Sequence, residues 1–265
     1  MGVLGEGSTS HVFKVSNNSG QVYALKVFKN KENNQFIQQE YIKSFLSDSD
    51  NIVSCYALYL FKRQYSMLFE YMDMPLSKFN TVFRHKQENT IAYIMREALK
   101  GLEYLHNQFT IHRDIKCENL FVNVKGEIKI GDLGYNAQLF RERDVRETIA
   151  GTPLWTAPEV LSGKMYTLSC DIWSLGMSCI ELVEGDARYN DSKNALELQI
   201  KLLHDAEPRL SSPWSENLQE FIVSCMQKDP AQRKTVSLLL QSPFIQSVNE
   251  SAAIQYIKNI VTSNP

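Results

Sequence analysis

The sequence predicts an α+β fold of two lobes: a small β-rich lobe with one main helix, and a larger lobe that is mostly helical. Two observations predict this. Short alternating apolar runs dominate the N-terminal part of the 265 residues, as expected for strands with one buried face. After the loop Asp73-Met74-Pro75, apolar residues recur at helical spacing through most of the remaining chain.

The predicted small lobe consists of strands around a single helix. The turn 16–20 separates two apolar runs, which favours a hairpin. Ile37, Tyr41 and Phe45 are spaced four residues apart, so 33–46 is predicted to be an amphipathic helix. Segments 52–60 and 65–71 return to strand character, and a hinge near Glu70–Asp73 follows. The first alternating runs contain Val12, Val15, Val22, Ala24, Leu25 and Val27.

The predicted large lobe has five main helical segments, at 92–106, 172–183, 195–203, 218–226 and 236–240. A further apolar stripe near the C-terminus predicts one more helix, which we expect to pack on its own lobe. We therefore expect one domain over 1–265, with a small lobe (1–72), a large lobe (73–246) and a helical extension (247–265). A cleft between two lobes is where a nucleotide is expected to bind.

Composition excludes several classes of protein. A formal net charge of −2 gives no basic field, so nucleic acid binding is not expected. Five cysteines lie far apart without a C-x-x-C pair, which indicates reduced thiols in an intracellular, cytoplasmic protein. No apolar run reaches the ~18 residues that a membrane span requires, and there is no signal-peptide pattern.

The most informative stretch is 112–119 (HRDIKCEN), followed by Asp132-Leu133-Gly134. Phosphoryl transfer requires positioning and charge neutralisation rather than covalent chemistry, and this stretch supplies the groups for both. Asp114 would orient or accept the proton of an attacking hydroxyl, and Lys116 would neutralise charge on the transferred group. Asn119 and Asp132 offer oxygen ligands to a hard cation, Mg²⁺ or alternatively Mn²⁺.

A glycine-containing segment precedes the second predicted strand and reads GEGSTSHV from Gly5 to Val12. Glycines allow the backbone to approach phosphates and direct N–H groups at them. A Rossmann site is excluded because a strand follows the glycines, and a Walker A loop is excluded because no G-K-[ST] closes it. Alone the segment is also compatible with an ordinary hairpin turn, since Ser10 stands where a third glycine would complete the pattern.

Lys26 lies on a predicted strand in the run Tyr23-Ala24-Leu25-Lys26. An inward-pointing lysine needs a counter-charge, because an unpaired buried ammonium is costly. Glu40 on the predicted helix is the expected partner. The alternative is a surface lysine and a solvated glutamate.

These motifs, in this order, resemble the catalytic domain of eukaryotic protein kinases over residues 2–246. The run 151–160 (GTPLWTAPEV) is similar to that of Ste20-family serine/threonine kinases, in the p21-activated and germinal-centre branches. The resemblance implies the two-lobed protein-kinase fold with a small antiparallel sheet. It also implies ATP and Mg²⁺ as cofactors, and transfer of the γ-phosphoryl group to serine or threonine of protein substrates in intracellular signalling.

The resemblance assigns further roles around the nucleotide. Val12 and Ala24 would cover one side of the adenine ring and Phe121 the other, with Phe69 at the back of the pocket. Backbone groups of the hinge would bind the adenine edge, and the glycine segment would cover the phosphates. The implied nucleotide-binding residues are Leu4, Gly5, Glu6, Gly7, Ser8, Val12, Ala24, Lys26, Glu40, Glu70, Met72 and Phe121.

The resemblance also implies structural and regulatory roles in the large lobe. Thr152 would brace Asp114 and Lys116, Asp171 would anchor the catalytic loop, and Glu159 would form a buried ion pair with Arg233. Thr148 occupies a position that is phosphorylated in many relatives, and its phosphate would pair with Arg113. Phe36 and Ala137 stand where relatives often add basic groups. An upstream kinase or a small GTPase would act through segments outside these residues.

Two alternative functions remain open from the sequence. Ser10, Leu133 and Ser44 depart from the kinase pattern, which keeps a pseudokinase-like scaffold possible. The unusual hinge, 72–75, suggests a dual-specificity enzyme similar to the MAP kinase kinases. The retained site residues argue against the scaffold, and the run 151–155 argues against the dual-specificity enzyme.

Overall fold

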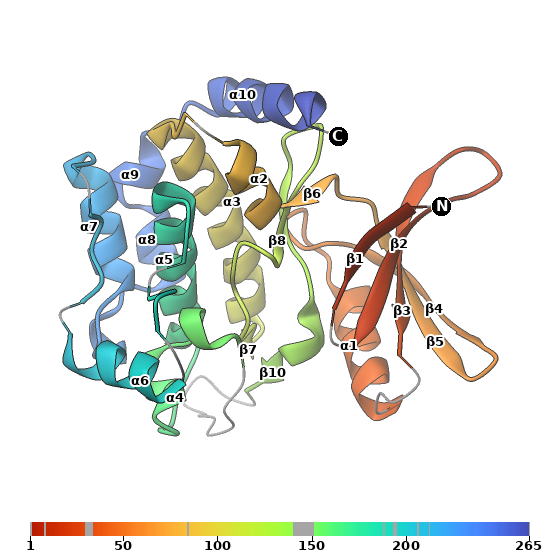
Figure 1. The fold of residues 1–265 in the computed structure, drawn as a ribbon, viewed down its shortest axis with the longest axis horizontal. Helices are drawn as coiled ribbons and strands as arrows, with labels where there is room; N and C mark the ends of the chain where they lie inside the picture. Colours follow the sequence, from red (N-terminus) through yellow and green to blue (C-terminus); the bar gives the residue numbers. More distant parts are fainter. Residues whose placement is uncertain are drawn as a thin grey trace.

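A computed structural model describes residues 2–7, 9–29, 34–83, 85–139, 151–187, 189–192, 195–205, 207–211 and 213–264. Figure 1 shows a small lobe built on a twisted sheet beside a larger helical lobe, as the sequence predicted. The two predicted site residues Ser8 and Thr148 lie outside the described residues.

The small lobe is a five-stranded antiparallel sheet with the order β1-β2-β3-β5-β4. The predicted turn between β2 and β3 is present, and the Asn17 side chain caps it by accepting the Ser19 and Gln21 N–H groups. The strands are β1 (Gly2–Glu6), β2 (Ser10–Ser16), β3 (Val22–Phe28), β4 (Cys55–Phe61) and β5 (Gln64–Glu70).

Helix α1 (Asn34–Leu46) packs on this sheet, within one residue of the predicted bounds. Its buried face carries Ile37, which joins Phe28, Cys55 and Met67 in the small-lobe core. Glu40 lies on the same face and is only 1% exposed. The helical period that predicted α1 therefore also directs a carboxylate into the interior.

The segment between α1 and β4 belongs to the large lobe rather than to the sheet. The Val53 N–H donates to the Ile130 carbonyl at 2.8 Å, and the Ile130 N–H donates to the Asn51 carbonyl at 2.8 Å. The predicted strand 52–60 was therefore wrong at its start. Gly101 permits this contact, because a Cβ there would lie 2.8 Å from both the Asn51 carbonyl and an Ile130 methyl group.

The large lobe is organised around two long helices, α3 (Glu88–Asn107) and α5 (Ser169–Glu184). Most side chains of α5 are buried, including Trp173, so this helix forms the centre of the core. Around them lie α2 (Leu76–Val82), α4 (Pro158–Leu161), α6 (Ala195–His204), α7 (Glu216–Cys225), α8 (Val236–Leu240) and α9 (Pro243–Gln246).

Short strands hold the loops that face the small lobe. Strands β6 (Met74–Pro75), β8 (Leu120–Val122) and β9 (Ile128–Ile130) form one sheet. Strands β7 (Thr110–Ile111) and β10 (Ala137–Gln138) form a second. Single-turn 3₁₀ helices follow at η1 (Leu133–Tyr135), η2 (Pro153–Trp155) and η3 (Pro230–Gln232). These strands were not predicted, because two or three residues carry no readable period.

The C-terminal helix α10 (Glu250–Ser263) lies across α2 and α3, as Figure 1 shows in dark blue. Ile257 and Val261 are buried against the lobe, and Arg96 pairs with Glu250 at 2.8 Å. The expectation that this helix packs on its own lobe is confirmed. Among the helices described, none is both long and apolar enough to span a bilayer.

Candidate active site

The loop 112–119 is held in place by Asp171, which lies in the first turn of α5. Its carboxylate accepts the backbone N–H groups of His112 and Arg113, each at 2.8 Å, and also contacts His106 Nε2 at 2.9 Å. Burial alone would raise the pKa of Asp171, but the hydrogen bond and charge of His106 outweigh burial and lower it. The carboxylate stabilises a loop in which Arg113 has a left-handed φ of 71°.

His112 was not given a role by the sequence, although it is fully buried. Its Nε2 lies 3.1 Å from the Gly131 carbonyl, and its Nδ1 accepts the Asp114 N–H at 3.2 Å. With Nδ1 accepting the Asp114 N–H, the Nε2–H is the group that can donate to the Gly131 carbonyl. His112 therefore ties the backbone of Asp114 to the residue that precedes Asp132.

The Asp114 carboxylate is 6% exposed and receives two side-chain hydrogen bonds. Thr152 Oγ1 donates to Oδ1 at 2.7 Å, and Asn119 Nδ2 donates to Oδ2 at 2.8 Å. Lys116 Nζ lies 3.4 Å from Oδ2 and donates to Thr152 Oγ1 at 2.7 Å. The structure thus brings together the predicted base, the predicted cation and Thr152.

Lys116 stays charged in this setting. Burial alone would lower the pKa of the ammonium, but the carboxylates of Asp114 and Glu118 outweigh it and raise the pKa. Asn119 uses both amide protons on Asp114, at the backbone carbonyl and at Oδ2, each at 2.8 Å. Its side-chain oxygen is consequently the atom that can serve a cation.

Gly151 allows Thr152 to reach Asp114. The φ of Gly151 is +102°, and a Cβ at this position would collide with the Arg113 carbonyl oxygen. Both the conformation and the close approach require glycine. The predicted brace between Thr152 and the catalytic loop therefore depends on the residue before it.

Lys26 on β3 lies between two carboxylates. Its Nζ is 2.7 Å from Glu40 Oε1 and 3.0 Å from Asp132 Oδ1, so the predicted ion pair with Glu40 is present. Burial alone would lower the pKa of Lys26, but Asp132 and Glu40 outweigh burial and raise it well above its usual range. Burial also raises the pKa of Glu40, whose Oε2 is buried without a hydrogen-bond partner among the described residues.

Asp132 contributes to this ion pair from a left-handed backbone conformation, with φ 57°. Burial alone would raise its pKa, but the positive charge of Lys26 outweighs burial and lowers it. The carboxylate remains 35% exposed, unlike Glu40. Asp132 is thus an ionised, accessible oxygen donor at the end of β9.

The glycine turn joins β1 to β2 and is closed by the Gly7 N–H, which donates to the Ser10 carbonyl at 2.8 Å. Lys29, which directly follows β3, holds the turn in place: its Nζ donates to the Gly7 carbonyl at 2.8 Å and lies 3.3 Å from Glu6. A Cβ at Gly5 would meet no atom of the described residues within 4 Å, so space for a ligand remains there. Lys29 was missed by the sequence analysis.

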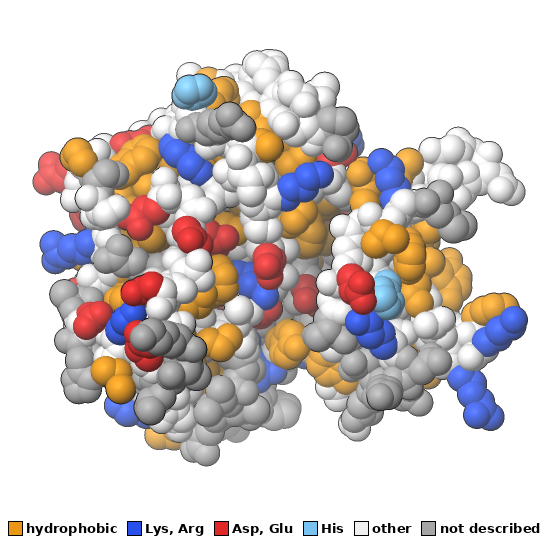
Figure 2. Space-filling view, in the orientation of Figure 1, with side chains coloured by type: hydrophobic (Ala, Val, Ile, Leu, Met, Phe, Trp, Pro, Cys, Tyr) orange, Lys and Arg blue, Asp and Glu red, His pale blue; other side chains and the backbone are white. Residues whose placement is uncertain are grey.

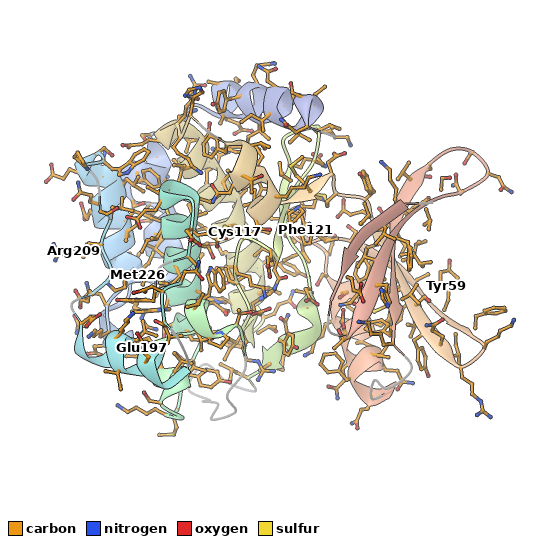
Figure 3. The ribbon with its side chains drawn as sticks, viewed as in Figure 1. Tyr59, Cys117, Phe121, Glu197, Arg209 and Met226 are labelled. Atoms are coloured by element: carbon orange, nitrogen blue, oxygen red, sulfur yellow. The ribbon has the colours of Figure 1, made fainter. Side chains whose placement is uncertain are left out.

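The residues predicted to enclose the adenine ring lie around the border of the lobes. Val12 and Ala24 share one face of the sheet, because Val12 pairs with Lys26 and Lys14 pairs with Ala24. Phe121 on β8 lies on the large-lobe side of that border in Figure 3, and its ring packs beside Gly131. Figure 2 shows a groove between the lobes on this face.

The hinge residues take up defined positions. Glu70 ends β5, and its carboxylate pairs with Lys129 at 2.9 Å. Met72 follows two residues later and is 7% exposed. Leu4, on the edge strand β1, is 42% exposed. The register aligns Glu6 with Val27 through His11, and Glu70 with Tyr23, so the glycine turn and the hinge lie at opposite ends of the strands.

The departures from the kinase pattern are accommodated by packing. Leu133 is buried at 2% exposure in the large-lobe core, and Ser44 is buried at 2% on α1. Phe36 packs edge-on to Tyr135 with ring centroids 6.2 Å apart. Arg113 Nε donates to the Tyr135 carbonyl, so the predicted phosphate-binding arginine is tied to this segment.

The large lobe also contains the predicted ion pair of Arg233 with Glu159. The guanidinium binds both carboxylate oxygens, at 2.6 and 2.8 Å, and its side chain is fully buried. The remaining guanidinium protons go to backbone carbonyls, including that of Gln227 at 2.8 Å. This pair fastens the run 151–160 to the rest of the lobe.

The donor set suits a nucleotide-bound cation better than a resident metal. Among the described residues, no group of three or more His, Cys, Asp or Glu side chains could hold a metal by itself. Asn119 and Asp132 offer hard oxygen donors, which fits a cation that keeps waters and takes phosphate oxygens as further ligands.

Comparisons with known proteins point to one family. The family model described as the protein kinase domain matches residues 1–245. The chain is 38% identical over 250 residues to the serine/threonine-protein kinase dst1 of Dictyostelium discoideum, covering 92% of this chain. It spans about a third of that relative, 34% of its length.

Proposed function

The chain belongs to the protein kinase domain family, and we propose that it transfers the γ-phosphoryl group of ATP to serine and threonine hydroxyls of protein substrates. One observation carries this proposal: Asp114, Lys116 and Thr152 form a continuous hydrogen-bonded group beside Asn119. A carboxylate, a cation and an oxygen donor are thus held at one point.

Asp114 acts on the attacking hydroxyl. Thr152 and Asn119 each donate to one of its two oxygens, so the carboxylate is already oriented before the substrate binds. It orients the hydroxyl and accepts its proton as the new bond forms. Lys116, already beside this carboxylate, offsets the negative charge on the group being transferred.

Lys26 and the glycine turn bind the phosphates of the nucleotide. Lys26 is positioned by Glu40 and donates to the α- and β-phosphates, while the glycine turn, which Lys29 holds at the Gly7 carbonyl, covers them. Asn119 and Asp132 would hold Mg²⁺, or alternatively Mn²⁺. When bound, such a cation neutralises phosphate charge.

Serine/threonine specificity, and membership of the Ste20 group, rest on Lys116 and on the run 151–160. The Thr152 hydroxyl contacts both Asp114 and Lys116, which gives that residue a direct use in the site. Both alternative functions, a scaffold and a dual-specificity enzyme, lack an observation that favours them. The resemblance to a serine/threonine kinase supports the choice.

We extend the proposal to regulation and setting. The chain would act as one domain, with lobes 1–72 and 73–246 and an extension 247–265. Phosphorylation of Thr148 by an upstream kinase would add an anion that pairs with Arg113. A small GTPase would act through segments outside these residues. All five cysteines are buried and free, which supports a reducing, cytoplasmic location.

Labelled-phosphate transfer from Mg-ATP tests the proposed function. The wild-type chain and Asp114→Asn are compared on a basic serine/threonine peptide and on its tyrosine counterpart. Asp205→Asn, at an exposed position of the large lobe, is the matched control. We expect transfer to serine or threonine only, lost with Asp114→Asn and retained with Asp205→Asn. Normal ATP binding without transfer, at full Thr148 phosphorylation, would favour the scaffold instead.

A further inference from the structure

The end of the β4–β5 hairpin, residues 59–63, exposes apolar side chains that the kinase site does not use; we call it the hairpin tip. Tyr59 is 51% exposed, Leu60 60% and Phe61 71%. Single exposed apolar residues are ordinary on protein surfaces, but three in succession at one apex are not. Their presence requires an explanation.

The apex of the tip is also positively charged. Lys62 and Arg63 form the turn itself, with φ values of 47° and 65°, and both are exposed. Lys62 Nζ lies 5.3 Å from the centre of the Phe61 ring, so charge and apolar surface are adjacent. The segment from Cys55 to Phe69 contains no acidic residue, although the whole chain has a net charge of −2.

The tip is presented on a rigid base. Below it, Leu58 and Met67 belong to the small-lobe core, and the ladder continues to the Phe61–Gln64 pair. Figure 1 shows the hairpin projecting away from the large lobe, and Figure 3 shows Tyr59 on its outer part. In Figure 2 the end of this hairpin is orange and blue, for apolar and basic side chains.

We propose that the hairpin tip binds the surface of membranes that contain anionic lipids. Leu60 and Phe61 enter the headgroup region, while Lys62 and Arg63 contact the lipid phosphates and carboxylates. Apolar side chains combined with adjacent cations are the features that hold peripheral segments at such surfaces. The active site, at the border of the lobes, stays free in this orientation.

A membrane fits the tip better than a protein partner does. A stable protein interface needs a broad surface, on the order of 800 Å² per partner, whereas this apex is convex and five residues long. The other exposed large apolar residues of the small lobe lie elsewhere: Val3 and Leu4 on β1, Tyr56 on β4, and Ile42, Phe45 and Leu46 on α1. They have no adjacent pair of cations, so the charge argument applies to the tip alone.

Co-sedimentation of the full chain with lipid vesicles tests the proposal. We expect binding to vesicles of phosphatidylcholine with phosphatidylserine, weakened by salt, and no binding to phosphatidylcholine alone. Lys62→Gln combined with Arg63→Gln should weaken binding about thirtyfold. Leu60→Ser with Phe61→Ser should weaken it by at least about tenfold.

Two control pairs separate the tip from general surface effects. Lys164→Gln with Met165→Ser changes an exposed basic and apolar pair on the large lobe, and should leave vesicle binding unchanged. Phe45→Ser with Leu46→Ser removes the exposed residues of α1 and should also leave it unchanged. Circular dichroism and transfer to a soluble peptide verify that each variant is folded, independently of lipid.

Three results would overturn the proposal. The first is equal binding to neutral and anionic vesicles. The second is that both folded tip variants bind anionic vesicles as tightly as the wild-type chain, or that the wild-type chain binds at no lipid concentration. The third is self-association in sedimentation velocity that the tip substitutions abolish, because a second copy of the chain would then be the occupant of this surface.

Discussion

The Thr152 hydroxyl donates to Asp114 Oδ1 at 2.7 Å and accepts from Lys116 Nζ at the same distance. One hydroxyl therefore sets the positions of both groups that act on the transferred phosphoryl. Thr152 lies far from the loop 112–119 in sequence, and the Gly151 conformation brings it there. Correct placement of the run 151–160 is thus a condition for an assembled catalytic site.

Replacing Thr152 with valine should lower kcat while leaving the KM for ATP nearly unchanged. Valine matches threonine in shape but leaves Asp114 with one fewer donor. Loss of a hydrogen bond to a charged group predicts a fall of about ten- to one-hundredfold. Steady-state kinetics of Thr152→Val and Thr152→Ser measure it, and the serine variant should retain most activity. An equal loss in both would mean that packing, not the hydroxyl, matters.

Replacing Glu40 with glutamine should raise the KM for ATP by about tenfold or more, because Lys26 loses a charged partner 2.7 Å away. Asp132 would then be the carboxylate that pairs with Lys26, and Asp132 is also the residue predicted to hold the cation. The Mg²⁺ concentration needed for half-maximal rate should therefore rise as well. Titration of ATP and of Mg²⁺ separates the two effects. A variant with unchanged requirements for both would show that the ion pair is only structural.

The order of the lobes was predictable because it depends on the spacing of apolar residues along the chain. The chemical groups of the site were predictable because they belong to recognisable motifs. Helix α1 and the Lys26–Glu40 pair are of this kind: Glu40 follows Ile37 by three residues, which places the carboxylate on the same buried face. The start of β4 was not predictable from apolar content. Ile52 and Val53 are as apolar as strand residues, yet they pair with the large lobe.

The supporting contacts could not be read from the sequence either. Lys29 reaches across a strand pair to the Gly7 carbonyl, and His112 bridges two loops through its ring nitrogens. Both contacts depend on tertiary placement rather than on any spacing. The exposure of the hairpin tip could not be predicted from the sequence either, because Leu60 and Phe61 continue an ordinary strand pattern beyond the point where the core ends.

Replacing Lys29 with methionine should loosen the glycine turn and raise the KM for ATP. Methionine keeps the unbranched stem but cannot donate to the Gly7 carbonyl. The loss of one charged donor predicts a change of up to about tenfold, with kcat affected less. ATP titrations measure this, beside Lys62→Met at the exposed β4–β5 turn as a matched control for charge. If Lys62→Met shifts the KM by the same factor, the charge of the small lobe rather than the turn is responsible.

Asp171 should make stability depend on acid pH. Its pKa lies below the usual 3.8, so the carboxylate stabilises the fold fully above the unfolded value and less as pH falls through the folded one. Asp171→Asn should therefore have a lower free energy of unfolding than wild type at pH 7. The difference between the two free energies should become smaller below about pH 4. Urea unfolding across this pH range measures the difference. A difference in free energy of unfolding that stays constant at the lowest pH measured would contradict the role of the ionised carboxylate.

Breaking the buried pair of Arg233 and Glu159 should destabilise the chain more than it harms the chemistry. Glu159→Gln leaves a guanidinium without its anion in a site where the Arg233 side chain is fully buried. Removal of one partner of such a pair costs about 3–5 kcal/mol of unfolding free energy.

Arg233→Met should cost a similar amount, whereas the double variant should cost less than the two single losses added together, because neither charge is then left unpaired. Urea unfolding of all four proteins gives the coupling. Below the unfolding temperature of each variant, kcat should remain close to wild type, since neither side chain touches Asp114 or Lys116. Additive losses would show that the two residues act independently, and a large fall in kcat of the folded protein would place the pair within the catalytic arrangement.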